Sequence, residues 1–116
     1  MLELRKTPRI NVSWRSGIKL PDGRLILCRT MNISSGGILL QSPQNLVSMR
    51  SYPMMLDIPG IDEPGKIFHV GCMGMIRHVV LSNDHYRIGV QLSEMSSLHE
   101  ELFQAWISKA QVYNHA

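Results

Sequence analysis

The chain has 116 residues, of which 44% are hydrophobic and 18% are charged, and this composition predicts one globular domain. No apolar run reaches the length of a membrane-spanning helix, and the charged Arg5 and Lys6 are not followed by the apolar segment of a signal peptide. A cytoplasmic protein is therefore expected. Cys28 and Cys72 lie far apart and fit no metal-binding or redox spacing, so we interpret both as small buried hydrophobic residues.

The formal net charge of +3 comes from the start of the chain. The first fifteen residues hold four basic side chains, Arg5, Lys6, Arg9 and Arg15, and one acidic side chain, Glu3. The remaining residues hold eight of each sign and are neutral overall. A basic excess confined to one short segment suits a compact anion better than a nucleic-acid backbone, although a solvated basic tail would have the same composition.

The first nine residues show no apolar repeat with the period of a strand or a helix, and Pro8 disfavours a helix there. We therefore predict a flexible arm over residues 1–9 and a folded domain over residues 10–116. Alternating apolar and polar residues bounded by turn signals predict six β-strands, at residues 10–20, 24–30, 38–41, 52–58, 66–80 and 86–92. Gly71 and Gly74 interrupt the fifth strand, and glycines inside a strand are typical of bulges or bends.

An α-helix is predicted over residues 97–110, at the C-terminal end of the domain. Apolar residues recur there at helical spacing from Leu98 to Ala110, with Trp106 among them. Ser97 and Glu100 have the spacing of a capping box. Six short strands and one amphipathic helix predict a mainly β fold, a six-stranded antiparallel β-barrel capped by a C-terminal α-helix.

Two polar motifs stand out, Arg5-x-x-x-Arg9 near the start and Asn32-x-Ser34-x-x-Gly37 between two apolar segments. In an extended strand Asn32 and Ser34 share one face, while Ile33 points the other way into a core. A glycine at position 37 permits a positive φ or a close approach of the backbone to a ligand. Each motif alone is a weak signal, because Asn-x-Ser followed by glycines is also common in turns.

Together with the Gly89-Val90 strand and the terminal helix, these motifs resemble the PilZ domain, the bacterial receptor module for cyclic diguanylate (c-di-GMP). The resemblance covers essentially the whole chain and implies a PilZ-type barrel with c-di-GMP as ligand and no cofactor or metal. It implies that Arg5 and Arg9 contact phosphate and guanine and that Asn32 contacts a guanine edge. Ser34 would contact a phosphate or the backbone, and Gly37 would keep the surface open.

A second group of candidate contacts comprises Lys6, Ser35, Gly36, Met75 and Arg77. Arg77 resembles an arginine that family members often carry on this strand, although a solvated strand residue is the alternative. A guanidinium suits this ligand because it can pair with phosphate or with a guanine edge, and can stack on a base. Many members carry a further arginine where this chain has Leu4, so we expect one bound ligand rather than a stacked pair.

The predicted function is a receptor that passes a ligand-induced surface change to a downstream partner protein, without membrane insertion. The alternative is a protein-interaction adaptor that has the PilZ fold and binds no nucleotide. A barrel that binds single-stranded nucleic acid ranks last, because aromatic residues are few. An enzyme is not predicted, since no carboxylates or histidines cluster, and Asp84 and His85 lie in a predicted turn.

Overall fold

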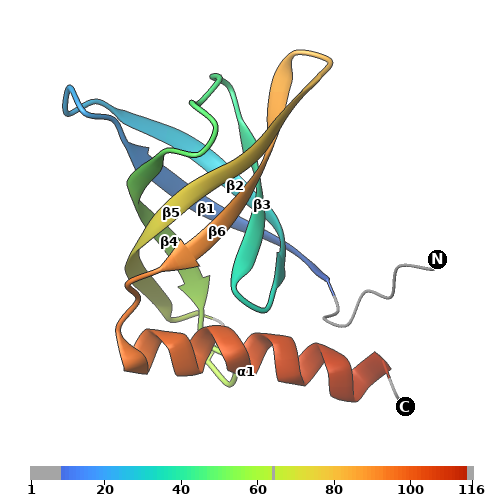
Figure 1. Ribbon diagram of the computed structural model, residues 1–116. Coiled ribbons are helices and arrows are strands. Elements are labelled where there is room, and N and C mark those ends of the chain that lie inside the picture. The colour runs from blue at the N-terminus through green and yellow to red at the C-terminus, as the bar shows by residue number, and fades with distance from the viewer. Residues whose placement is uncertain (1–8, 64, 115–116) are drawn as a thin grey trace.

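The computed structural model describes residues 9–63 and 65–114. Figure 1 shows a closed antiparallel barrel with the strand order β1-β2-β3-β6-β5-β4 and one helix lying across one end. The strands are β1 Ile10–Lys19, β2 Leu25–Ser34, β3 Gly37–Ser42, β4 Ser51–Pro59, β5 Ile67–Ser82 and β6 His85–Ser93, and the helix is α1 Ser97–Asn114. The predicted mainly β barrel with a C-terminal helix is confirmed.

The barrel closes around side chains that alternate along each strand. Ile18, Ile33, Leu56 and Ile88 are fully buried, whereas their neighbours in sequence are mostly more exposed. This is the alternation expected of strands with one face in a core and one face in water. Cys72 is buried and Cys28 is partly buried, and both are free thiols, as their spacing suggested.

Helix α1 closes one end of the barrel, where Phe103 and Ile107 are 2% and 5% exposed. The predicted capping box at Ser97 is wrong, because the backbone N–H of His99 donates to the Oγ of Ser96 at 3.2 Å. Ser96 is therefore the N-cap, and Ser97 is the first helical residue. Leu98, expected on the buried face, is 67% exposed, so the buried face of the helix does not include this residue.

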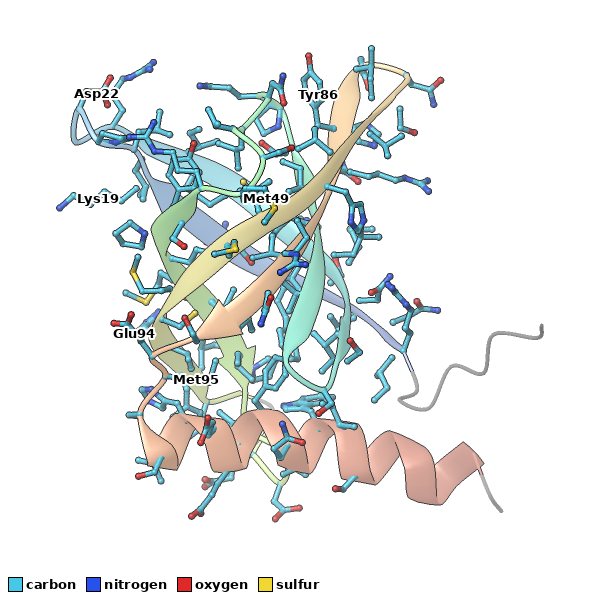
Figure 2. The ribbon with its side chains drawn as sticks, in the orientation of Figure 1. Lys19, Asp22, Met49, Tyr86, Glu94 and Met95 are labelled. Carbon is cyan, nitrogen blue, oxygen red and sulfur yellow. The ribbon has the colours of Figure 1, made fainter. Side chains whose placement is uncertain are left out.

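The opposite end of the barrel carries the β1–β2 and β5–β6 hairpins, which project away from α1 (Figure 1). Figure 2 shows Asp22 and Tyr86 on these two hairpins, and Glu94 and Met95 in the connection that leads into α1. Gly23 has a φ of 92°, which is the glycine conformation expected of the predicted β1–β2 turn. Among the described residues, no helix combines the length and the apolarity that crossing a membrane requires.

The bulge in β5 does not lie at either glycine, contrary to the prediction from the sequence. Pairing with β6 continues through Gly74 and shifts between Ile76 and His78. Gly74 serves packing instead, because a Cβ there would come closer than 3.0 Å to the sulfur of Met54 and to Cγ1 of Val90. A Cβ on Gly71 would meet nothing within 4 Å.

Candidate ligand-binding site

The Asn-x-Ser motif lies at the end of β2, where the chain turns into β3. Asn32 and Ser34 are partly exposed on the outer face of the barrel, and Ile33 between them is fully buried. Gly36 takes the positive φ of 80° in the turn, which the sequence had suggested for Gly37. Gly37 has a different requirement, because a Cβ there would lie 3.1 Å from the carbonyl oxygen of Val90 in β6.

The strand register places the motif beside residues from β6 and β5. One row of paired residues across the outer face is Asn32, Leu39, Gly89 and His78. The adjacent row is Ser34, Gly37, Gln91 and Met75. Each row contains a glycine at one of its middle positions, so side chains flank two low points in the surface. The result is a hollow on the outside of the barrel rather than an opening into its interior.

This hollow is a groove of about 320 Å³, which we call the motif groove. Its lining residues are Arg9, Ser34, Ser35, Gly36, Gly37, Ile38, Leu39, Arg77, His78, Gly89, Val90 and Gln91. The lining contains two arginines and no carboxylate. The motif groove therefore favours a negatively charged ligand on electrostatic grounds.

The two arginines of the motif groove are each held by a neutral amide. Nη1 of Arg9 donates to Oδ1 of Asn32 at 3.3 Å, and Nη1 of Arg77 donates to Oε1 of Gln91 at 2.9 Å. Neither contact neutralises the guanidinium. The Arg9 contact is long and exposed, so a phosphate oxygen can replace it at small cost.

Six of the predicted site residues line the motif groove, namely Arg9, Ser34, Ser35, Gly36, Gly37 and Arg77. Asn32 does not line the groove. It accepts the hydrogen bond from Arg9 and pairs with Leu39, and both of these residues line the groove. Met75 is in the row of Gln91 but is not part of the lining. Arg5, Lys6 and Leu4 lie outside the described residues, as does most of the predicted arm.

The sequence reasoning missed His78, Leu39 and Gln91 as groove residues, and used Gly89 only as part of a strand pattern. Leu39 and Gln91 reach the groove through strand pairing, which the sequence does not specify. His78 reaches it because the β5 bulge changes the direction of its side chain. The available signal was the spacing of Ile76 and Val79, which breaks the alternation of the preceding apolar residues.

A larger groove of about 790 Å³ lies elsewhere on the barrel. Its lining includes Arg15 and Arg29 but also Asp57 and Asp84, so its charges balance. Leu25, Leu27 and Met55, which are exposed, are among its lining residues. We therefore place the candidate anion site at the smaller motif groove, where the charge is of one sign.

Asp84 and His85 also line the larger groove, where the side chains are 3.2 Å apart. The hydrogen bond from His85 lowers the pKa of the Asp84 carboxyl. Cys28 lines the same groove, and burial raises the pKa of its thiol, which makes it a poor nucleophile. Within the described part of the chain, no three His, Cys, Asp or Glu residues gather in a way that could hold a metal ion.

Comparisons with known proteins agree with this fold. The inhibitor of motility MotI/DgrA of Bacillus subtilis superposes with a TM-score of 0.77 and 16% identity, over 97% of this chain and 53% of that one. YcgR of Escherichia coli in complex with c-di-GMP gives 0.71 and 17%, over 96% of this chain and 47% of that one. The PilZ domain of the same protein with c-di-GMP gives 0.65 and 17%, over 97% of this chain and 95% of that one.

The chain thus spans about half the length of the first two of these proteins, 53% and 47%. The TM-scores of 0.77, 0.71 and 0.65 establish a common fold, and identities of 16–17% establish nothing beyond the fold. A search of curated protein sequences found no match. A sequence model of the PilZ domain matches residues 3–109, which is nearly the whole chain, and the chain therefore belongs to the PilZ domain family.

Proposed function

We propose that this protein is a receptor that binds c-di-GMP in the motif groove. The observation that carries the proposal is the convergence of Arg9, Arg77 and the Ser34–Gly37 turn on one hollow without a carboxylate. The family supports it, because two solved structures of similar fold, those of YcgR and of its PilZ domain, contain c-di-GMP.

The ligand offers two phosphates and two guanine bases, and the motif groove together with the neighbouring Asn32 offers groups that can pair with both kinds. Arg9 and Arg77 can each pair with a phosphate or with the O6 and N7 edge of a guanine. Asn32 can accept from a guanine N–H through the same amide oxygen that now contacts Arg9. Ser34 supplies a hydroxyl at the edge of the groove. We extend the proposal to Arg5, which precedes Arg9 by four residues.

Signalling follows if the ligand changes the surface around the start of β1. Arg9 stands immediately before β1, so a ligand that engages its guanidinium also acts on the chain segment that precedes the barrel. A partner protein that distinguishes the two states would read the signal.

The test is calorimetric titration of the purified protein with c-di-GMP. Titrations with GTP and with linear diguanylate are the controls for specificity. We expect selective binding of one ligand per chain. Arg9→Ala should weaken it about ten- to a hundredfold, because a charge-assisted contact contributes roughly 1.5–3 kcal/mol. The matched control is Arg24→Ala, since Arg24 is exposed at the far hairpin and pairs with Asp22.

Binding by Arg9→Ala at the wild-type affinity would contradict the role of Arg9. No binding by the wild-type protein at high micromolar ligand would refute the receptor. The second candidate function, an adaptor that binds protein only, would then be preferred. The larger groove favours that candidate, because Leu25 and Leu27 on it are 61% and 74% exposed.

A further inference from the structure

The β5 bulge places two consecutive side chains on the outer face of the barrel. Ile76 pairs with Val90 of β6 and His78 pairs with Gly89, so Arg77 is the extra residue between the two pairs. In a regular strand Arg77 and His78 would point to opposite faces. Here both are exposed and both line the motif groove. A strand that supplies two neighbouring groups to one site is a frequent use of a bulge beside a binding site.

The imidazole of His78 lies directly on the backbone of Gly89. A Cβ built on Gly89 would come closer than 3.0 Å to Cε1, Nε2 and Nδ1 of His78, and no atom of another residue lies nearer. Three atoms of one ring at this proximity mean that the ring occupies the space above the glycine. Gly89 is thus a seat for the imidazole, and any larger residue there would displace it.

The contact with Gly89 leaves His78 available to a ligand. His78 is exposed and lines the motif groove, so the side of its ring turned away from Gly89 is open. Among the groove's lining residues, all of which are described, His78 is the only one with a ring. Nucleobases present flat faces that stack on aromatic rings, and a ring already seated on backbone loses little conformational freedom when it stacks.

We propose that His78 is a base-stacking contact of the motif groove, held in place by Gly89, on which one guanine of the ligand lies. The neighbouring Arg77 contributes charge to a phosphate or a guanine edge, so the two bulge residues have separate roles. This inference rests on the proposed function, since it specifies how the same groove recognises a base.

The test compares His78→Ala and His78→Phe with the wild-type protein in calorimetric titrations with c-di-GMP. We expect His78→Ala to bind at least about tenfold more weakly, because loss of one base–aromatic stack has an effect of this order. His78→Phe keeps a flat ring and should bind within about threefold of wild type. His69→Ala is the matched control, because His69 is an exposed histidine on the same strand that pairs with Asp57 outside the groove.

A double-mutant cycle tests whether Gly89 holds the His78 ring in place. Gly89→Ala should displace the ring and weaken binding about as much as His78→Ala. The double variant should bind no more weakly than either single variant, because the added methyl then has no ring to displace. Additive losses would contradict the claim that Gly89 acts by holding the His78 ring, and would mean that Gly89 meets the ligand itself. Thermal melts of each variant check that the barrel still folds.

The outcomes separate this inference from the proposed function. Wild-type binding together with unchanged affinity in His78→Ala would overturn the stacking role and leave the receptor standing. A loss in His78→Phe equal to that in His78→Ala would also overturn stacking, in favour of a hydrogen bond from the imidazole. Absence of binding by the wild-type protein would refute both. An upfield shift of the His78 ring protons on addition of c-di-GMP would support the stack directly.

Discussion

Replacing Trp106 by alanine tests how much this side chain contributes to holding α1 on the barrel, beside the more deeply buried Phe103 and Ile107. Trp106 makes three distinct contacts. Its Nε1 donates to the carbonyl oxygen of Pro59 at 2.9 Å, and its ring packs edge-on against Trp14 with centroids 5.6 Å apart. The ammonium of Lys109 also lies 5.9 Å from the ring centroid. The substitution removes all three contacts at once.

The expected loss follows from these contacts. The hydrogen bond contributes about 1 kcal/mol, and the edge-on aromatic pair adds about 0.5–1.5 kcal/mol beyond its buried area. Burial of the partly buried indole contributes about 1.5 kcal/mol, the lower end of the range for large apolar side chains. We therefore expect the free energy of unfolding to fall by about 3 kcal/mol. At about 3–5 °C per kcal/mol for a chain of this length, the melting temperature should fall by about 10 °C.

The assay is thermal and urea unfolding followed by circular dichroism. Trp106→Phe separates the contributions, because it keeps most of the ring and loses the bond to Pro59, and we expect it to cost about 1 kcal/mol. Leu98→Ala is the matched control on the same helix, since Leu98 is 67% exposed and its loss should change stability by less than about 0.5 kcal/mol. A melting temperature of Trp106→Ala within about 1 °C of wild type would refute the view that this residue fixes the helix.

Two further predictions concern the barrel interior. Gly74→Ala should destabilise the protein by about 1–3 kcal/mol, because the new methyl would collide with Met54 and Val90, whereas Gly71→Ala on the same strand should be close to neutral in the same urea unfolding; equal effects of the two would contradict the packing argument. Burial raises the pKa of the Cys72 thiol from 9.0 to about 11, so the folded state holds this proton more tightly than the unfolded chain. Stability should therefore be unaffected by this group below pH 9 and fall by up to about 1.4 kcal/mol per pH unit between pH 9 and 11. Unfolding titrations over that window should show a shallower fall for Cys72→Ala than for wild type, and parallel curves would exclude the buried thiol as the cause.

The fold could be predicted from the sequence because its signals are local. The clearest strands show apolar residues with a period of two, as β6 does from Tyr86 to Leu92, and burial of Ile88 and Val90 follows directly from that pattern. Turn residues such as Gly23 mark where strands reverse. Element boundaries are harder to predict: the sequence predicts the helix cap at Ser97 and the structure has it at Ser96, because a serine at either of two adjacent positions can serve as N-cap.

The candidate site could be predicted only in the part that the motifs cover. Arg9 and the Ser34–Gly37 turn were identified from the sequence, and the structure brings them together at the motif groove. Gln91 and Leu39 were not identified, because they reach the groove through pairing of β6 with β3, which joins residues about fifty positions apart. A residue that contributes through strand register leaves no local signal in a single sequence.

The β5 bulge lies between these two cases. Val70, Cys72, Gly74 and Ile76 occupy inward positions with a period of two, and the next inward apolar residue is Val79 rather than residue 78. That change of parity is visible in the sequence and requires an extra residue, so it predicts that Arg77 and His78 share the outer face. What it cannot predict is the neighbour that the outer face meets. Only the pairing with β6 shows that His78 lies over Gly89, where a ring fits because no side chain competes for the space.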